Sequence, residues 1–170
     1  GSEVDYPPYC FVNEQDEAAG FSVELFRAAA QEMGIEVKFK TGTWNKLKYD
    51  LVNNKIDALP LVGRAPEREE MYDFTVPYLT MHGAIVVRED VHNINSVDDL
   101  KGKQVAIMKG DNAEEFLRRT DLGADIIQRT TFKRALIELS EGQHDAVLIQ
   151  RLTALQLMKE NGLTNLKIVG

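Results

Sequence analysis

The sequence predicts an α/β fold made of two successive units. Short apolar runs alternate with segments of helical period along most of the 170 residues. This pattern is typical of βαβ units with a parallel sheet and helices on both faces. Near the middle, the apolar strand at 84–87 is followed by a polar stretch at 88–95, which we interpret as the crossing between the units.

The first half alternates helices and strands. Ser22 is a candidate N-cap for a helix that Gly34 ends, and Thr43 is a candidate N-cap for a second helix. The expected elements are a helix at 22–33, a strand at 35–40, a helix at 44–53 and a strand at 56–62.

The second half repeats this alternation. Ser96 is expected to cap a short helical turn, and Asp111 or Asn112 is expected to cap a longer helix. The expected strands are 84–87, 104–108, 125–130, 146–149 and 166–169, and the expected helices are 97–101, 112–119, 132–141 and 151–161.

Composition excludes several classes of function. The net charge is −7 and no basic stripe occurs, which argues against nucleic acid and against anionic membrane surfaces. The single cysteine, Cys10, cannot form an internal disulfide and is interpreted as a small buried hydrophobe. No apolar run approaches the ~20 residues of a membrane-spanning helix.

Nothing in the sequence indicates catalysis, a metal or a cofactor. The three histidines, at 82, 92 and 144, lack metal-ligand spacing, and no Gly-x-Ser-x-Gly elbow or Walker loop is present. The acidic pairs at 98–99 and 114–115 fall on short helices, where neighbouring side chains point apart. We interpret these pairs as solubilising.

The segment 63–78 carries two arginines beside a turn proline. Arg64 and Arg68 follow the apolar run 56–62, and open α/β sheets bind ligands beyond the carboxyl ends of their strands. The planar fork of an arginine suits a carboxylate or a phosphate. The alternative is a surface ion pair with Glu67, Glu69 or Glu70, which would contribute little.

This segment resembles the Thr-Pro-Glu-Arg … Asp-Phe-Ser-x-Pro-Tyr segment of the family 3 bacterial solute-binding proteins, which have the type II periplasmic-binding-protein (Venus-flytrap) fold. Arg68 matches the arginine that grips the α-carboxylate of an amino acid in that family. Ala65 and Thr75 depart from the family's threonine and serine. Further matching blocks lie, in family order, at 6–9, 20–25, 54–58, 98–103, 109–112 and 144–147.

The resemblance implies two lobes. Lobe one is expected at 3–86, a hinge crossing at 87–88, lobe two at 89–165 and the start of a return crossing at 166–170. Family members usually begin with a strand before the Tyr-Pro-Pro segment and return to lobe one after lobe two. Lobe one is therefore expected to be truncated at both chain ends. Its open sheet edges would favour a homodimer or strand exchange.

The resemblance also implies a ligand in the cleft between the lobes. Tyr6 and Trp44 match positions that sandwich the ligand side chain, although both could be ordinary core aromatics. The turn before the helix at 112–119 would offer backbone amides to an anion. The expected ligand-binding residues are Tyr6, Trp44, Gly63, Arg64, Arg68, Met108, Gly110, Asp111, Asn112 and Gln150.

Three of these residues depart from the family pattern. Asp111 either caps its own helix or repels a carboxylate and favours a cationic group. Arg64 either adds positive charge to the cleft or points to solvent. Gln150 stands where amino-acid binders have an aspartate that pairs with the ligand ammonium. Either another acid, such as Asp111, takes over this role, or the ligand has no α-ammonium, because burying an unpaired ammonium is costly.

These departures, and the segments 62–64, 79–83 and 150–152, look most like the sensor domains of bacterial transmembrane receptors such as histidine kinases. The resemblance implies a periplasmic or other extracytoplasmic domain that binds a small molecule, either an amino acid or a small carboxylate, and signals by lobe closure. The ligand is expected to be anionic. One alternative is the amino-acid-binding protein of an ABC transporter, which works with a permease. Another is a cyclohexadienyl-dehydratase-like enzyme, which would need an acid facing Arg68.

Overall fold

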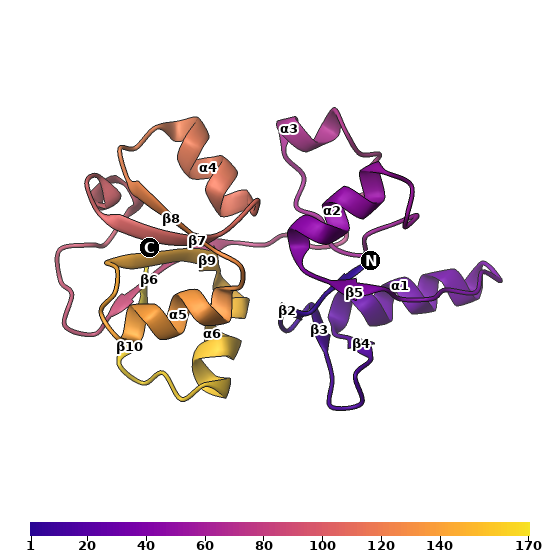
Figure 1. The fold of residues 1–170 in the computed structure, drawn as a ribbon, viewed down its shortest axis with the longest axis horizontal. Coiled ribbons are helices and arrows are strands. Elements are labelled where there is room, and N and C mark those ends of the chain that lie inside the picture. Colours follow the sequence, from indigo (N-terminus) through magenta and orange to yellow (C-terminus); the bar gives the residue numbers. More distant parts are fainter. The chain divides into compact units, whose positions relative to one another are not determined.

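The computed structural model describes residues 1–170, which divide into two compact units, unit 1 at Gly1–Tyr78 and unit 2 at Leu79–Gly170 (Figure 1). This division differs from the expected lobe boundary at 86–87. The strand β6 (Gly83–Arg88) forms antiparallel ladders with two strands of unit 2, and so all of it belongs to the sheet of that unit. Residues 79–86 are therefore corrected from lobe one to unit 2.

Unit 1 contains two small sheets and three helices. β2, β3 and β4 form an antiparallel sheet, and β1 and β5 form a parallel pair. The elements are β1 (Ser2–Glu3), β2 (Asp5–Tyr6), β3 (Cys10–Val12), β4 (Ala18–Ala19), α1 (Phe21–Glu32), β5 (Thr41–Gly42), α2 (Trp44–Val52) and α3 (Pro66–Glu69).

The expected strands at 35–40 and 56–62 are absent, and with them the larger parallel sheet of the first half. A β-strand requires a series of backbone hydrogen bonds to a neighbouring strand. Each of these two segments instead accepts a hydrogen bond from a residue at the start of the chain. Lys40 O accepts a hydrogen bond from Ser2 N at 2.9 Å. Ala58 O accepts one from the terminal amino group of Gly1 at 2.7 Å. Alternation at 35–40 and apolar composition at 56–62 therefore did not predict sheet pairing, and the residues at 35–40 are exposed or only partly buried.

The helices of unit 1 begin close to the expected residues. α1 has Gly20 at its N-cap rather than Ser22, with φ 111°, and a Cβ at Gly20 would lie 2.4 Å from Tyr9 O, so only glycine fits. Ser22 lies inside α1, where its hydroxyl accepts from Tyr78 Oη at 2.9 Å. Thr43 occupies the N-cap position of α2, as expected, but its side chain makes no capping hydrogen bond.

Cys10 is buried, as expected. Burial raises the pKa of its thiol to about 12, and the nearby carboxylate of Glu3 acts in the same direction. The group is therefore a neutral thiol at physiological pH, and a thiolate nucleophile is not available there.

Unit 2 is built on a mixed five-stranded sheet in the order β10-β6-β9-β7-β8. β7 is parallel to both β8 and β9, whereas β6 is antiparallel to β9 and β10. The remaining elements are the 3₁₀ helix η1 (Val97–Leu100), β7 (Gln104–Met108), α4 (Asn112–Thr120), β8 (Asp125–Arg129), α5 (Phe132–Ser140), β9 (Ala146–Gln150), α6 (Arg151–Glu160) and β10 (Leu166–Val169).

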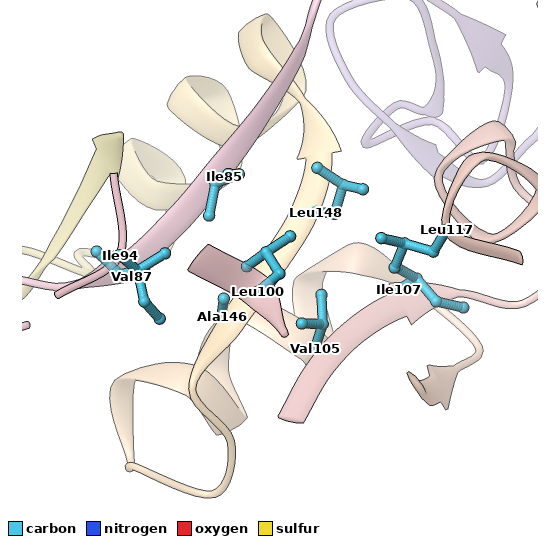
Figure 2. Close-up of a cluster of buried hydrophobic side chains, with 9 residues drawn as sticks. All are labelled: Ile85, Val87, Ile94, Leu100, Val105, Ile107, Leu117, Ala146 and Leu148. Carbon is cyan, nitrogen blue, oxygen red and sulfur yellow. The ribbon is translucent and has the colours of Figure 1, made fainter. Parts of the chain in front are cut away.

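Helices cover both faces of this sheet, as expected for unit 2, with α4 on one side and α5 and α6 on the other (Figure 1). Strand residues alternate between the two faces. Figure 2 shows the core on the first side, where strand residues such as Ile85, Val105 and Leu148 meet Leu100 of η1 and Leu117 of α4. In the helices of both units, no run of residues combines the length and the apolar character that crossing a bilayer requires.

Candidate ligand-binding site

In unit 1, Arg68 and Trp44 form the centre of the candidate site. Arg68 lies in the short helix α3 and is only 2% exposed, while Trp44 opens α2 and is 5% exposed. The guanidinium carbon of Arg68 lies 5.2 Å from the centroid of the Trp44 ring, within the range of a cation–π contact. Arg68 Nη1 also donates to Gly63 O at 3.1 Å, so the structure brings three expected site residues together.

A second cation contacts the same ring. Lys48 Nζ lies 5.2 Å from the Trp44 centroid, one helical turn further along α2. The sequence reasoning did not select Lys48, although the i, i+4 spacing of Trp44 and Lys48 was a usable signal. With Arg68, this places two positive groups around one aromatic ring of unit 1.

Arg64 and Tyr6, two other expected residues of unit 1, make the following contacts. Arg64 Nε bonds to Glu69 Oε1 at 2.5 Å, and the two side chains are 58% and 47% exposed. This is the surface ion pair considered above as the alternative for Arg64, and solvent weakens such pairs. Tyr6 is buried and its ring packs against that of Tyr9, with centroids 6.3 Å apart.

In unit 2, the other expected residues gather at one edge of the sheet. β7 and β9 are parallel neighbours, with Val105 opposite Ala146, so their carboxyl ends share an edge. The residues at this edge are Met108, Gly110, Asp111, Asn112 and Gln150. Ligands of open α/β sheets bind beyond the carboxyl ends of strands.

Asp111 acts as a helix cap. It is the N-cap residue of α4, and its Oδ2 accepts from Ala113 N at 3.1 Å. This agrees with the first of the two roles considered for Asp111. Gly110, which precedes it, donates its backbone N–H to Glu114 Oε2 at 2.6 Å. The amide that was expected to attract a ligand anion therefore already binds a carboxylate of the protein.

Glu114 corrects the interpretation of the acidic pair 114–115 as solubilising. It is buried, and its Oε1 accepts from Arg118 Nε at 2.9 Å and from Gln128 Nε2 at 2.5 Å. Glu114 therefore ties the turn at Gly110 to α4 and β8. The spacing Asp111-x-x-Glu114 resembles a capping box and could have indicated this role from the sequence.

Gln150 is the last residue of β9 and directly precedes α6. It is 8% exposed, and its Oε1 accepts from Thr153 N at 2.9 Å and from Thr153 Oγ1 at 3.3 Å. Gln150 is thus the N-cap residue of α6. Glutamine is not a favoured N-cap residue, so propensity gave no signal for this role.

The chain has the two-lobed type II fold of the periplasmic binding proteins. The chain belongs to the bacterial extracellular solute-binding proteins, family 3, whose family model matches residues 1–164.

Relatives and solved structures agree with this assignment. The chain is 35% identical over 163 residues to the L-cystine-binding protein TcyJ of Escherichia coli (strain K12), covering 94% of this chain and 61% of TcyJ. It thus spans about three fifths of the length of that relative.

Two solved structures are similar over nearly the whole chain. An ancestral arginine-binding protein bound to arginine has a TM-score of 0.91 and 33% identity, with 99% of this chain and 76% of that chain covered. A histidine kinase sensor domain with similarity to periplasmic binding proteins has a TM-score of 0.95 and 32% identity, with 99% and 74% covered.

Proposed function

We propose that this chain is the extracytoplasmic ligand-binding domain of a bacterial signal-transduction receptor. In this proposal a small anionic molecule, either an amino acid or a small carboxylate, binds between the two lobes. It stabilises the closed form because it binds that form more tightly. Closure is then the signal that the receptor transmits.

The observation that carries the binding proposal is the buried Arg68 stacked on Trp44. The planar fork of a guanidinium can hold a bound carboxylate through two parallel hydrogen bonds. The ring contact holds the guanidinium plane in place before a ligand arrives, so less side-chain entropy is lost on binding. Arg68 is therefore the proposed anchor for the ligand carboxylate.

The edge of unit 2 is the proposed second half of the site. Met108, Gly110, Asp111, Asn112 and Gln150 follow the carboxyl ends of β7 and β9. Tyr6 and Gly63 are proposed to contribute from lobe one. Arg64, which pairs with Glu69, is proposed to influence the ligand through its charge and not by contact.

A thermal-shift screen of amino acids, dicarboxylates and other small anions tests the binding proposal. A ligand present at about 100 times its dissociation constant adds about 2.7 kcal/mol of stability to the folded state. We expect at least one small acid to raise the midpoint of unfolding. No response from any acid in the screen would contradict the proposal.

The sensor role is supported by the similarity to a histidine kinase sensor domain, with its TM-score of 0.95. The second candidate is the binding protein of an amino-acid ABC transporter, which the similarity to TcyJ favours. The complete gene distinguishes the two. A downstream membrane helix with a kinase or cyclase domain supports the sensor, and adjacent permease genes support the transporter.

Binding without turnover is part of the proposal. A dehydratase on this fold would need an acid that faces Arg68. Incubation of the protein with prephenate and with arogenate checks this point by chromatography. We expect both compounds to be recovered unchanged, and enzyme-dependent conversion of either would contradict a purely binding role.

A further inference from the structure

Two cationic side chains of unit 1 converge on the indole of Trp44. The guanidinium carbon of Arg68 and the Nζ atom of Lys48 each lie 5.2 Å from the centroid of this ring. Both distances are within the range of a cation–π contact. The two cations come from different helices, α3 and α2, and they are no further apart than twice that distance because they share one centroid.

Local structure sets the positions of both cations. Lys48 follows Trp44 by four residues in α2, and residues at this spacing share one face of a helix. Lys48 is partly buried. Arg68 is buried, and its Nη1 donates to Gly63 O at 3.1 Å. The positive charge around Trp44 is therefore built into unit 1.

The acidic residues of the same two helices have other positions or partners. Glu69 of α3 pairs with Arg64. Glu67 directly precedes Arg68 in α3, and adjacent side chains on a helix do not face each other. Asp50 of α2 is bound by two other lysine side chains, at 2.8 and 2.6 Å. The charges that these helices bring to the ring of Trp44 are thus the two cations.

A cationic group of a ligand would meet like charge at this ring. The face of an indole attracts cations through its quadrupole, and here the protein uses this attraction for two cations of its own. A guanidinium or ammonium placed against Trp44 would be a third positive charge around one ring. Like charges repel more strongly where solvent is partly excluded, so a neutral or anionic group is favoured.

We infer that Lys48 is a specificity residue which, together with Arg68, makes the surroundings of Trp44 select ligands with a neutral or anionic side chain and reject those with a cationic one. The inference rests on the proposed function and narrows its ligands. Acidic and neutral amino acids and small dicarboxylates remain, whereas arginine and lysine are excluded. All the residues that carry the inference belong to unit 1.

Lys48→Met tests the inference, because it removes the charge and keeps an unbranched side chain. Arg68 and Trp44 are unchanged in this variant, so the proposed anchor for the ligand carboxylate is retained. Lys55→Met is the matched control. Lys55 Nζ also lies over an aromatic ring, that of Tyr49, at 4.9 Å, but Tyr49 is 55% exposed.

Calorimetric titration with pairs of similar shape and different charge gives the readout. The pairs are L-citrulline and L-arginine, L-2-aminoadipate and L-lysine, and glutarate and 4-aminobutyrate. We expect the wild-type protein and Lys55→Met to bind the first member of each pair that binds about tenfold or more tightly than the second. We expect Lys48→Met to reduce this ratio about threefold or more.

The outcomes separate the inference from the proposed function. If the wild-type protein prefers the cationic member of any pair, or if Lys48→Met keeps the wild-type ratio, the inference is wrong and the proposed function stands. If no member of any pair binds, the inference fails as well, and the thermal-shift screen decides separately whether the proposed function stands. Lys48→Gln, which is also uncharged, replaces Lys48→Met if that variant does not fold.

Discussion

The guanidinium of Arg68 stacks on the indole of Trp44 at 5.2 Å, and both side chains are withdrawn from solvent. A hydrogen bond from Arg68 Nη1 to Gly63 O adds a second constraint on the guanidinium. The cation is therefore positioned by contacts within unit 1. This relationship links the stability of the unit to the proposed binding of an anion.

Trp44 should contribute strongly to the stability of unit 1. Trp44→Ala removes a large buried aromatic side chain, and such truncations cost about 3–5 kcal/mol. Trp44→Phe keeps a ring for Arg68 and should cost less. Urea unfolding followed by circular dichroism measures both. The control Tyr49→Ala, at an exposed aromatic on the same helix, should stay within about 0.5 kcal/mol of wild type. Equal effects of Trp44→Ala and Tyr49→Ala would contradict the packing described here.

Glu114 should hold the turn before α4. Glu114→Ala leaves Gly110 N, Arg118 and Gln128 without their shared carboxylate. Hydrogen bonds to charged groups contribute about 1.5–3 kcal/mol, so we expect a loss of this size in the free energy of unfolding. Glu114→Gln should lose less. Glu160→Ala removes an exposed glutamate and should have little effect, and the same small effect at Glu114 would refute the role given to it.

Asp50 should make stability depend on acid pH. Hydrogen bonds from Lys40 and Lys46 lower the pKa of this carboxyl from 3.8 to about 2. The lysine nitrogens lie 2.8 and 2.6 Å from Asp50 Oδ2. Because the folded-state pKa is depressed, the contribution is present above pH 3.8 and is lost as the pH falls towards about 2.

Asp50→Asn should therefore be less stable than wild type at pH 7, and the two should converge in acid. Unfolding by urea at a series of pH values checks this, with the exposed Asp98→Asn as a control that runs parallel to wild type. A difference between wild type and Asp50→Asn that stays constant from pH 7 to pH 2 would show that the lysine contacts do not matter.

His144 should make the free energy of unfolding depend on pH in a higher range than Asp50 does. It is buried, and neither ring nitrogen has a hydrogen-bond partner. Burial lowers its pKa below the ordinary value of 6.5, and the charge of nearby Arg129 acts in the same direction. The unfolded chain therefore binds a proton at this residue before the folded chain does, and stability falls as the pH drops below 6.5.

His144→Phe removes this titration. Its free energy of unfolding should vary less between pH 7.5 and 5.5 than that of wild type, whereas His92→Gln, at an exposed histidine, should follow wild type. Thermal unfolding across these pH values is the measurement. An unchanged pH dependence in His144→Phe would mean that another group causes it.

The secondary structure of unit 2 could be predicted well because its signals are local. The apolar runs at 105–108 and 146–149 correspond to β7 and β9, and Asp111 is the N-cap residue of α4, as its residue type suggests. The predicted strands at 35–40 and 56–62 in unit 1 were wrong, because a strand forms only when another strand pairs with it. Likewise, the order of residues did not reveal that β6 joins the sheet of unit 2.

For the candidate site too, the sequence indicated some features and not others. The motif around Arg68 identified the residue, but its stacking on Trp44 depends on how α2 and α3 pack. The orientation of the Gln150 amide and the burial of Glu114 depend on which backbone N–H groups face these side chains. Such details follow from tertiary structure and could not be predicted from spacing alone.

The most direct test of the account is the affinity of an Arg68→Ala variant for the acid that gives the largest thermal shift. Loss of charge-assisted hydrogen bonds worth about 1.5–3 kcal/mol predicts binding that is about 10- to 150-fold weaker. Arg27→Ala is the matched control, because Arg27 also lies over an aromatic ring, Phe39, at 5.1 Å, but is half exposed and paired with Glu24. Calorimetry should give wild-type affinity for Arg27→Ala and the large loss for Arg68→Ala. Wild-type affinity in folded Arg68→Ala would contradict the account.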